Sequence, residues 1–193
     1  MLKDKLSGKK LILASQSPRR KALLQAMDLD FDVLVRPVDE SFPPDLSASA
    51  AAEYIALSKG AAFKNDLLPD QIIITGDTVV VHEKKILGKP KNDKEAREML
   101  KELSGTTHQV ISSLCLMNTS KTVVDSDIAL VHFKEFTQEE IEYYITNYSP
   151  FDKAGAYGIQ EWLGHIGLIK LEGSYNTVMG LPTQLLYKML QHF

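Results

Sequence analysis

Arg19 and Arg20 directly follow Ser17 and Pro18, an arrangement that is typical of a helix start. Ser17 suits the N-cap position, and Pro18 suits the first helical position, where its missing N–H costs nothing. Positive charge in the first turn opposes the helix macrodipole, so two arginines there are unfavourable unless an anion binds nearby. With Ser15, these residues therefore predict a phosphate-binding site of hydroxyls, guanidinium groups and backbone N–H groups. The alternative is that the arginines are simply solvated.

Asp77 lies in the middle of the most apolar segment of the chain, residues 71–81. The β-branched residues on both sides of it predict a central strand. An ionised carboxylate in such a strand needs a partner or a chemical task. Gly76 beside it indicates a bulge or a close approach of another backbone. Asp77 is therefore the leading candidate for a catalytic residue.

Three further charged residues are candidates for the same chemistry. Glu40 follows Asp39 after a predicted strand, and paired acids in that position can hold a divalent cation, although they are more often only solvated. Lys59 lies near the small-residue face of a predicted helix, where it could reach an anion or extend into solvent. Lys89, between a glycine and a proline, is a second candidate phosphate ligand.

The predicted elements alternate between strands and helices along most of the chain. Residues 149–160 show no sustained periodicity and are expected to form a functional loop, and residues 173–176 a turn. The order of elements predicts an α/β fold with a mixed sheet. The strands are expected at residues 11–14, 31–35, 71–81, 86–87, 107–117, 122–136 and 166–171. The helices are expected from residue 18 onward, from residue 47 or 49 to residue 65, and at residues 92–103, 137–147 and 182–192.

The length of 193 residues suits one domain, or one domain split into two lobes around a cleft. Its 44% hydrophobic and 24% charged residues are ordinary globular values. The apolar runs are too short for a membrane span, and no secretory signal is found. Cys115, the only cysteine, excludes an internal disulfide and suits the cytoplasm. The net charge of −3 disfavours a nucleic-acid partner, so the basic residues are expected to bind a small anion.

Several well-known catalytic motifs are absent from the sequence. There is no GxxxxGK[ST] loop and no GxGxxG after a strand, which excludes a P-loop enzyme and a dinucleotide fold. Without HExxH or paired CxxC motifs, a zinc site is unsupported. The histidines are scattered, so no Ser-His-Asp triad is indicated.

Six motifs, in order along residues 11–182, make the chain resemble the Maf family. The sequence Ala-Tyr-Gly-Ile-Gln within the fifth motif resembles that of the branch of the family that hydrolyses dTTP and UTP. The resemblance implies a cytoplasmic nucleoside triphosphate pyrophosphatase that depends on a divalent metal, Mg²⁺ or Mn²⁺. It also implies a single domain, residues 1–193, whose two lobes flank a nucleotide-binding cleft, as in inosine triphosphate pyrophosphatases. The motifs are SQSPRR (15–20), GDTVV (76–80), LGKP (87–90), LSGTTH (103–108), DKAGAYGIQ (152–160) and NTVMGLP (176–182).

The resemblance also implies roles for individual residues. Asp77 matches the proposed proton acceptor of the family, and Glu40, Lys59 and Lys89 match charged residues of its cleft. Positions associated with substrate choice are matched by Arg19, Thr78 and Gln160. A role in clearing noncanonical nucleotides and in arrest of cell division is implied as well.

The chain departs from the family pattern at two places. Gln16 stands where a glycine or asparagine is frequent, and Glu161-Trp162 follows Gln160 where a glycine is usual. The second departure adjoins the residue expected to contact the base, so the loop that carries Gln160 is expected to be affected.

These inferences combine into one mechanistic hypothesis. Glu40 and Asp77 hold the metal, Asp77 takes a proton from the attacking water, and attack at the α-phosphorus releases pyrophosphate. The amide of Gln160 complements N3–H and a carbonyl of uracil or thymine. The competing hypothesis is a nucleotide-sensing regulator without turnover, and the sequence leaves a homodimer open. The predicted phosphate ligands are Ser15, Ser17, Arg19, Arg20, Lys59 and Lys89.

Overall fold

A computed structural model describes residues 2–193, and the chain divides into two compact units. The first contains the described residues up to Asp77, together with Ser112–Asp127 and Gly180–Phe193. The second contains Thr78–Ile111 and Ile128–Met179. The chain therefore passes from the first unit to the second directly after Asp77.

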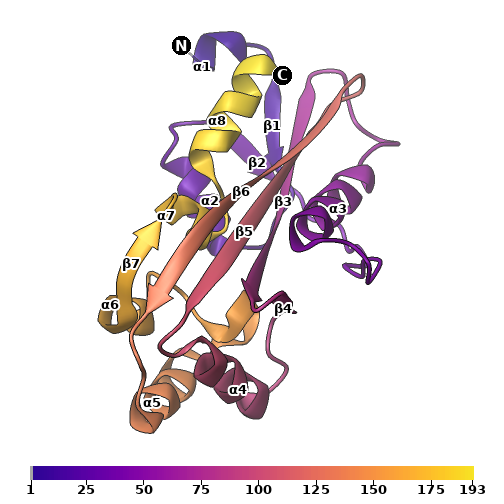
Figure 1. The fold of residues 1–193 in the computed structure, drawn as a ribbon. Coiled ribbons are helices and arrows are strands. Elements are labelled where there is room, and N and C mark those ends of the chain that lie inside the picture. Colours follow the sequence, from indigo (N-terminus) through magenta and orange to yellow (C-terminus); the bar gives the residue numbers. More distant parts are fainter. Residues whose placement is uncertain (1) are drawn as a thin grey trace. The chain divides into compact units, whose positions relative to one another are not determined.

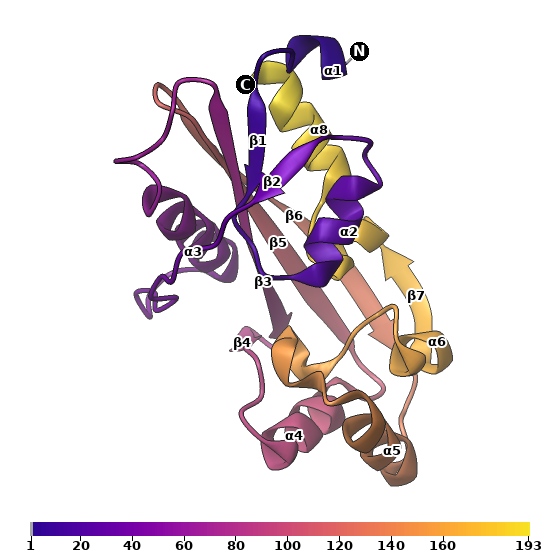
Figure 2. The ribbon, with the colours of Figure 1, turned by 180° about the vertical axis from the view of Figure 1, so that it is seen from behind.

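A seven-stranded mixed sheet forms the centre of the fold, with the order β2-β1-β3-β5-β6-β7 and with β4 paired to β3 (Figure 1). β2 and β3 both run parallel to β1, whereas β4 and β7 are antiparallel to β3 and β6. Figure 2 shows β2 next to β1. The predicted α/β class with a mixed sheet is confirmed. The strands are β1 (Lys10–Leu13), β2 (Phe31–Val33), β3 (Gln71–His82), β4 (Lys85–Leu87), β5 (Thr107–Met117), β6 (Thr122–Phe133) and β7 (Leu168–Glu172).

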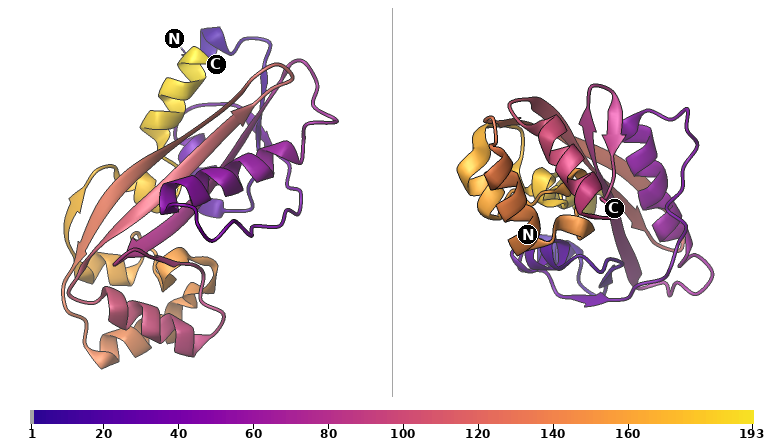
Figure 3. Two further views of the ribbon diagram at one scale, coloured as in Figure 1. Left: turned by 45° about the vertical axis from the view of Figure 1, so that its right-hand side comes forward. Right: turned by 90° about the horizontal axis from the view of Figure 1, so that it is seen from below.

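In the first unit, the alternation of side chains along the strands separates two apolar layers. Leu11 and Leu13 of β1 pack toward the layer that contains α1 (Leu2–Lys5), α2 (Pro18–Gln25) and α8 (Thr183–His192). Ile12 between them packs toward the layer that contains α3 (Ala48–Ala61). The two faces of the sheet are thus covered by different helices, as Figure 3 also shows. Cys115 is fully buried in the α3 layer.

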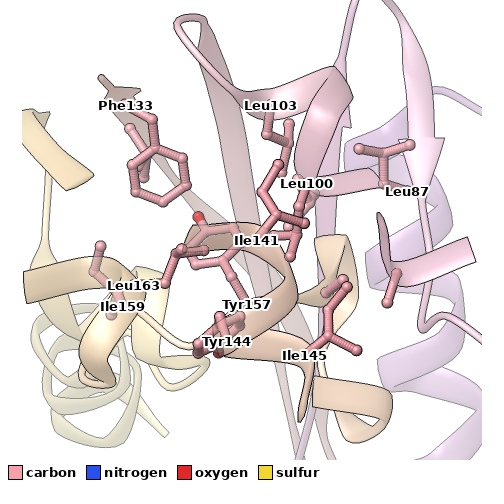
Figure 4. Packing of buried hydrophobic residues seen from close by; sticks show 14 of the residues in the cluster. Leu87, Leu100, Leu103, Phe133, Ile141, Tyr144, Ile145, Tyr157, Ile159 and Leu163 are labelled. Carbon is pink, nitrogen blue, oxygen red and sulfur yellow. The ribbon is translucent and has the colours of Figure 1, made fainter. Parts of the chain in front are cut away.

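The second unit has one apolar core, which lies among α4 (Asp93–Leu103), α5 (Gln138–Tyr148), α6 (Trp162–Gly167) and the chain before α6. Figure 4 shows Tyr157 among side chains of α4 and α5, including Leu100 and Ile141. The chain between α5 and α6 forms two short 3₁₀ helices, Pro150–Asp152 and Ala154–Ala156. The functional loop predicted at residues 149–160 therefore has a buried, ordered part.

Several element predictions were wrong in detail. The predicted strand 166–171 is β7, which begins only after α6, and the predicted turn 173–176 runs into α7 (Tyr175–Met179). In α6 a glycine permits close packing, because a Cβ on Gly164 would lie 2.0 Å from the Ile159 carbonyl oxygen. No helix was predicted between the loop at residues 149–160 and the strand at residues 166–171.

The ends of other elements also differ from their predictions. β6 ends at Phe133 rather than at residue 136, and its register against β7 shifts between His132 and Phe133. β2 ends at Val33 rather than at residue 35. α3 ends at Ala61 instead of residue 65. Within residues 2–193, no helix is long and apolar enough to cross a lipid bilayer.

Candidate functional site

The start of α2 forms as the sequence predicts. The Ser17 side chain accepts a hydrogen bond from the Arg20 backbone N–H at 3.4 Å, and Pro18 occupies the first helical position. The Ser17 N–H in turn donates to the Ser15 hydroxyl at 3.2 Å. These bonds fix the two serines and the first turn of α2 as one rigid corner after β1.

Arg20 is held by its own side chain against this corner. Its Nε donates to the Gly180 carbonyl at 2.7 Å, and its Nη1 donates to the Ser15 hydroxyl at 3.4 Å. Burial lowers the pKa of Arg20, whereas the nearby carboxylates of Asp77 and Glu40 raise it. Arg19, which is half-buried, also lowers the pKa of Arg20, so two guanidinium groups lie close together here. Such a pair favours binding of an anion.

Two carboxylates of the first unit meet at one ammonium group. The Lys59 Nζ lies 2.9 Å from Glu40 Oε1 and 2.8 Å from Asp77 Oδ1. The Asp77 side chain is 12% exposed and that of Glu40 is 49% exposed, so the pair combines one enclosed acid with one that faces solvent. The structure thus brings together three of the predicted residues from widely separated parts of the sequence.

The packing of β3 fixes the position of Asp77. A Cβ on Gly76 would lie 2.6 Å from the Ser113 carbonyl oxygen, so only glycine allows β3 to approach β5 this closely. Of the bulge and the close approach indicated by the sequence, the structure shows the close approach. Thr75 and Ser113 donate from their hydroxyls to carbonyls of α3, at 2.6 Å to Ala56 and at 2.7 Å to Ala52. The strand with Asp77 is therefore bonded to the helix that carries Lys59.

Glu40 lies in the segment after β2, which Arg36 ties to the end of α3. The Arg36 guanidinium donates to the Ala62 carbonyl at 2.8 Å and to Asp66 at 2.5 Å, and it lies 4.6 Å from the centre of the Phe63 ring. Asp39, the other acid of the predicted pair, accepts instead from the N–H and hydroxyl of Ser41. These bonds lower the pKa of Asp39. Of the two neighbouring acids, Glu40 is therefore the one that shares the Lys59 ammonium group with Asp77.

The remaining predicted residues belong to the second unit. Thr78 directly follows Asp77 on β3 and is half-buried, Lys89 is exposed in the segment after β4, and Gln160 is half-buried. The Gly88 carbonyl accepts from the Gly155 N–H at 3.0 Å, which joins the chain before Lys89 to the chain before Gln160. The cleft expected between two lobes stays a prediction.

Glu40 and Asp77 offer two carboxylates as possible ligands of a metal ion. Among residues 2–193, no group of three or more His, Cys, Asp or Glu side chains could hold a metal ion. A dedicated protein cage is therefore not present in the described chain. Mg²⁺, however, is commonly bound through one or two carboxylates, with water and substrate phosphates completing its shell. Glu40 and Asp77 are two carboxylates that lie close together, since both contact the Lys59 ammonium group, and they fit that mode of binding.

Known proteins resemble this chain over nearly its whole length. The family described as Maf-like protein matches residues 10–193. This chain belongs to the Maf family. It is 47% identical to the dTTP/UTP pyrophosphatase of Flavobacterium johnsoniae, over 98% of each chain. It is also 47% identical to the dTTP/UTP pyrophosphatase of Christiangramia forsetii, over 99% of this chain and 97% of that one.

The fold of this Maf family member is also found in a solved structure. The Staphylococcus aureus Ham1 protein aligns with a TM-score of 0.55 and 16% identity, over 95% of this chain and 99% of that one. At this identity the likeness concerns the fold alone, and it supports the α/β class predicted from the sequence.

Sequence reasoning missed the residues that support the acid pair. Thr75 and Ser113 are polar residues in apolar strands, and that signal could have identified them as hydrogen-bonded core residues. The carbonyl of Gly180 and the guanidinium of Arg36 had no such signal, because their partners lie far away in the sequence.

Proposed function

We propose that this protein hydrolyses dTTP and UTP to the nucleoside monophosphate and pyrophosphate. The observation that carries the proposal is the meeting of Glu40 and Asp77 at Lys59, in the same unit as Arg19 and Arg20. The charges around Arg20 include both acids and Arg19, so anion-binding and acidic groups are close to one another. The two relatives named dTTP/UTP pyrophosphatase support the choice of substrate.

The phosphate groups are bound by the corner between β1 and α2. Ser15, Ser17 and the guanidinium groups of Arg19 and Arg20 supply donors, and the N-terminus of α2 adds its partial positive charge. Because Arg20 is already held by Gly180 and Ser15, its orientation is set before the substrate binds. Lys59 and Lys89 are the further phosphate ligands of the proposal.

Glu40 and Asp77 would hold a divalent cation, Mg²⁺ or Mn²⁺, with the substrate phosphates. When bound, such a cation neutralises charge on phosphate oxygens and makes a water more acidic. Lys59 supplies a positive charge at the same two carboxylates and keeps them close together. The metal is a proposal from the donor set and from the family resemblance.

The chemical step is an attack of water on the α-phosphorus. The water oxygen forms a bond to phosphorus, and the bond from phosphorus to the bridging oxygen of the β-phosphate breaks. Asp77 takes the proton of the water, and pyrophosphate leaves with the electron pair of the broken bond. The arginines stabilise the charge that develops on the departing pyrophosphate.

The choice of base is assigned to Gln160, whose amide offers an acceptor and two donors in one plane. This pattern complements N3–H and a carbonyl of uracil or thymine, whereas cytosine has no N3–H. A pair of such hydrogen bonds discriminates by about 1–3 kcal/mol. Thr78 and Arg19 are also assigned to the choice of substrate, because they match positions associated with it in the family.

One assay tests the proposed function directly. UTP is incubated with the purified protein and Mg²⁺, and pyrophosphate and orthophosphate are measured separately. We expect pyrophosphate and UMP in equal amounts. Orthophosphate would indicate a phosphohydrolase, and tight UTP binding without either product would favour the nucleotide-sensing regulator. The same assay with dTTP, CTP and base-modified triphosphates defines the substrate.

Further properties remain proposals that rest on the family resemblance. They are a cytoplasmic location, removal of noncanonical nucleotides and a role in arrest of cell division. Whether two copies associate is decided by light scattering of the purified protein.

A further inference from the structure

The segment Gly155–Gln160 presents Gln160 from an otherwise buried stretch of chain. Residues 155–159 are all buried, and Gln160 is the first residue of the segment that solvent reaches. Gly155 and Ala156 both have positive φ angles, 70° and 61°, so the chain turns sharply here. A Cβ on Gly155 would lie 3.1 Å from both methyl groups of Val80. The backbone before Gln160 is therefore confined from its first residue.

Tyr157 anchors the middle of this segment. Its ring packs edge-on against Phe133, and its hydroxyl lies 2.7 Å from His108 Nε2. Tyr157 and His108 are 5% and 1% exposed, so this bond is sealed from solvent. The backbone at Tyr157 thus has little freedom, but the anchor lies three residues before Gln160.

A second set of bonds holds the chain around Gln160 itself. The Tyr144 hydroxyl of α5 accepts a hydrogen bond from the Gly158 N–H at 2.9 Å and donates one to Glu161 Oε2. The other oxygen of Glu161 lies 3.1 Å from Lys153 Nζ. Tyr144 therefore bonds residues on both sides of Gln160, and Lys153 fixes the carboxylate that completes the set.

Glu161 and Gln160 meet at Gly158. A Cβ built on Gly158 would lie 2.8 Å from the Glu161 carboxyl carbon and 3.1 Å from Gln160 Nε2. Both side-chain heads therefore use the space left by this glycine. A change in the position of the Glu161 carboxylate would change the space available to the Gln160 amide.

The Glu161 side chain does not serve the helix that it begins. Glu161 is the N-cap of α6, yet its carboxylate makes no capping hydrogen bond there. It extends instead to Tyr144 and to Lys153, whose side chain is only 8% exposed. An enclosed carboxylate and ammonium need close partners, and both oxygens of Glu161 have one, so this carboxylate is held in a defined position.

We propose that Glu161, held by Tyr144 and Lys153, is a positioning residue that sets the orientation of the Gln160 amide and thereby base selectivity. The inference rests on the proposed function for the identity of the base. The hydrogen bonds themselves do not depend on that function.

The test compares Glu161→Ala, Glu161→Gln and Tyr144→Phe with the wild type. Glu161→Ala removes the acceptor of Tyr144 and the partner of Lys153, whereas Glu161→Gln keeps an acceptor of the same shape. The matched control is Tyr148→Phe, whose ring stacks on Tyr144 at 5.1 Å but which lies outside the bonds described here. The readouts are the ratio of kcat/KM for UTP to that for CTP, and hydrogen exchange of residues 158–160.

We expect Glu161→Ala and Tyr144→Phe to lower the UTP-to-CTP ratio roughly tenfold, because a misplaced binding group loses much of its effect. Exchange of residues 158–160 should become faster in both variants. Glu161→Gln should retain most of the selectivity, and Tyr148→Phe should retain all of it. Thermal unfolding identifies any variant that does not fold. If either Glu161→Ala or Tyr144→Phe fails to fold, the other of these two variants decides whether selectivity depends on Glu161.

Failure of this inference and failure of the proposed function give different results. If the wild type does not release pyrophosphate from UTP, the proposed function is wrong, and the ratio of UTP to CTP dissociation constants replaces the kinetic ratio. If both ratios and the exchange of residues 158–160 are unchanged in Glu161→Ala, Glu161 is not a positioning residue. Faster exchange with unchanged ratios would also overturn its role in selectivity.

Discussion

Asp77 is the residue on which the proposed hydrolysis depends most, and Asp77→Asn separates its chemistry from its packing. Asparagine has the same shape and can still accept from Lys59, so the fold should be retained. Loss of the proton acceptor should lower kcat by a factor of about 10²–10⁴. The measurement is the initial rate of pyrophosphate release with UTP and Mg²⁺, with thermal unfolding as the check on folding. The exposed Asp45→Asn serves as the control, and a rate near that of the wild type would eliminate Asp77 as the base.

Glu40 and Asp39 are neighbours in the sequence with different surroundings, which makes them a matched pair for a test of metal binding. Glu40 shares Lys59 with Asp77, whereas Asp39 is occupied by Ser41. Removing one of two carboxylate ligands weakens a hard-cation site, so Glu40→Gln should raise the Mg²⁺ concentration for half-maximal rate at least roughly tenfold. Asp39→Asn should leave it unchanged. Chelation of Mg²⁺ by EDTA should stop the wild type, and equal Mg²⁺ requirements in both variants would remove Glu40 from the metal site.

Three of the candidate residues could be named from the sequence because each one conflicts with its surroundings. Asp77 is an acid in an apolar strand, and Arg19 and Arg20 are cations at a helix N-terminus. The structure shows Glu40, Lys59 and Asp77 in contact. The metal hypothesis implied that the two acids lie close together, but no sequence pattern indicated Lys59 as their common partner. Lys59 in particular was predicted to reach a phosphate or solvent, and its bonds to two acids depend on how α3 packs against β3.

At the level of elements, β3 illustrates how the packing of a strand sets the position of Asp77, the proposed proton acceptor. Gly76→Ala would place a Cβ 2.6 Å from the Ser113 carbonyl oxygen, so β3 and β5 must move apart. Overpacking of this kind costs about 1–3 kcal/mol. We expect a lower free energy of unfolding in urea and a lower kcat, because Asp77 is the next residue.

Gly88→Ala is the control for this prediction, because nothing lies within 4 Å of a Cβ at that position. Its free energy of unfolding should match that of the wild type. If Gly76→Ala is as stable and as active as Gly88→Ala, the close approach of the two strands does not determine the position of Asp77.

Elements with strong local signals were predicted well, and elements set by packing were not. α2 and α5 begin with side-chain N-cap bonds at Ser17 and Thr137, and a cap is a contact within four residues. α6 and α7 are short, and α6 begins at Glu161 without a side-chain cap bond, so its start had no local signal. The end of β6 likewise depends on β7, with which its register shifts at Phe133.

At the scale of the whole molecule, the order of elements and the composition were sufficient for the α/β class with a mixed sheet. The boundaries between the two units were not visible in the sequence, because no linker separates the units. β3, β5 and β6 each contribute residues to both units, with changes at Asp77–Thr78, Ile111–Ser112 and Asp127–Ile128. A continuous apolar strand gives no signal at such a boundary.

The stability of the whole fold should depend on pH through His108. Burial, together with the charges of His82 and His132, lowers the pKa of His108 to about 3 in the folded protein. An unfolded histidine titrates near about 6.5, so between these values the unfolded chain binds a proton that the folded chain does not. Stability is therefore full above about pH 6.5 and falls as the pH decreases toward about 3.

This contribution is measured by urea unfolding of the wild type and His108→Gln between pH 7 and pH 5. At lower pH, carboxylates also titrate and would obscure the effect of the histidine. The variant loses the bond to Tyr157 and should be less stable at pH 7. Its free energy of unfolding should nevertheless decrease less on acidification, by up to about 1.4 kcal/mol per pH unit. The exposed His165→Gln should follow the wild type. Parallel pH profiles for His108→Gln and the wild type would show that His108 is protonated equally in both states, which its burial beside Tyr157 argues against.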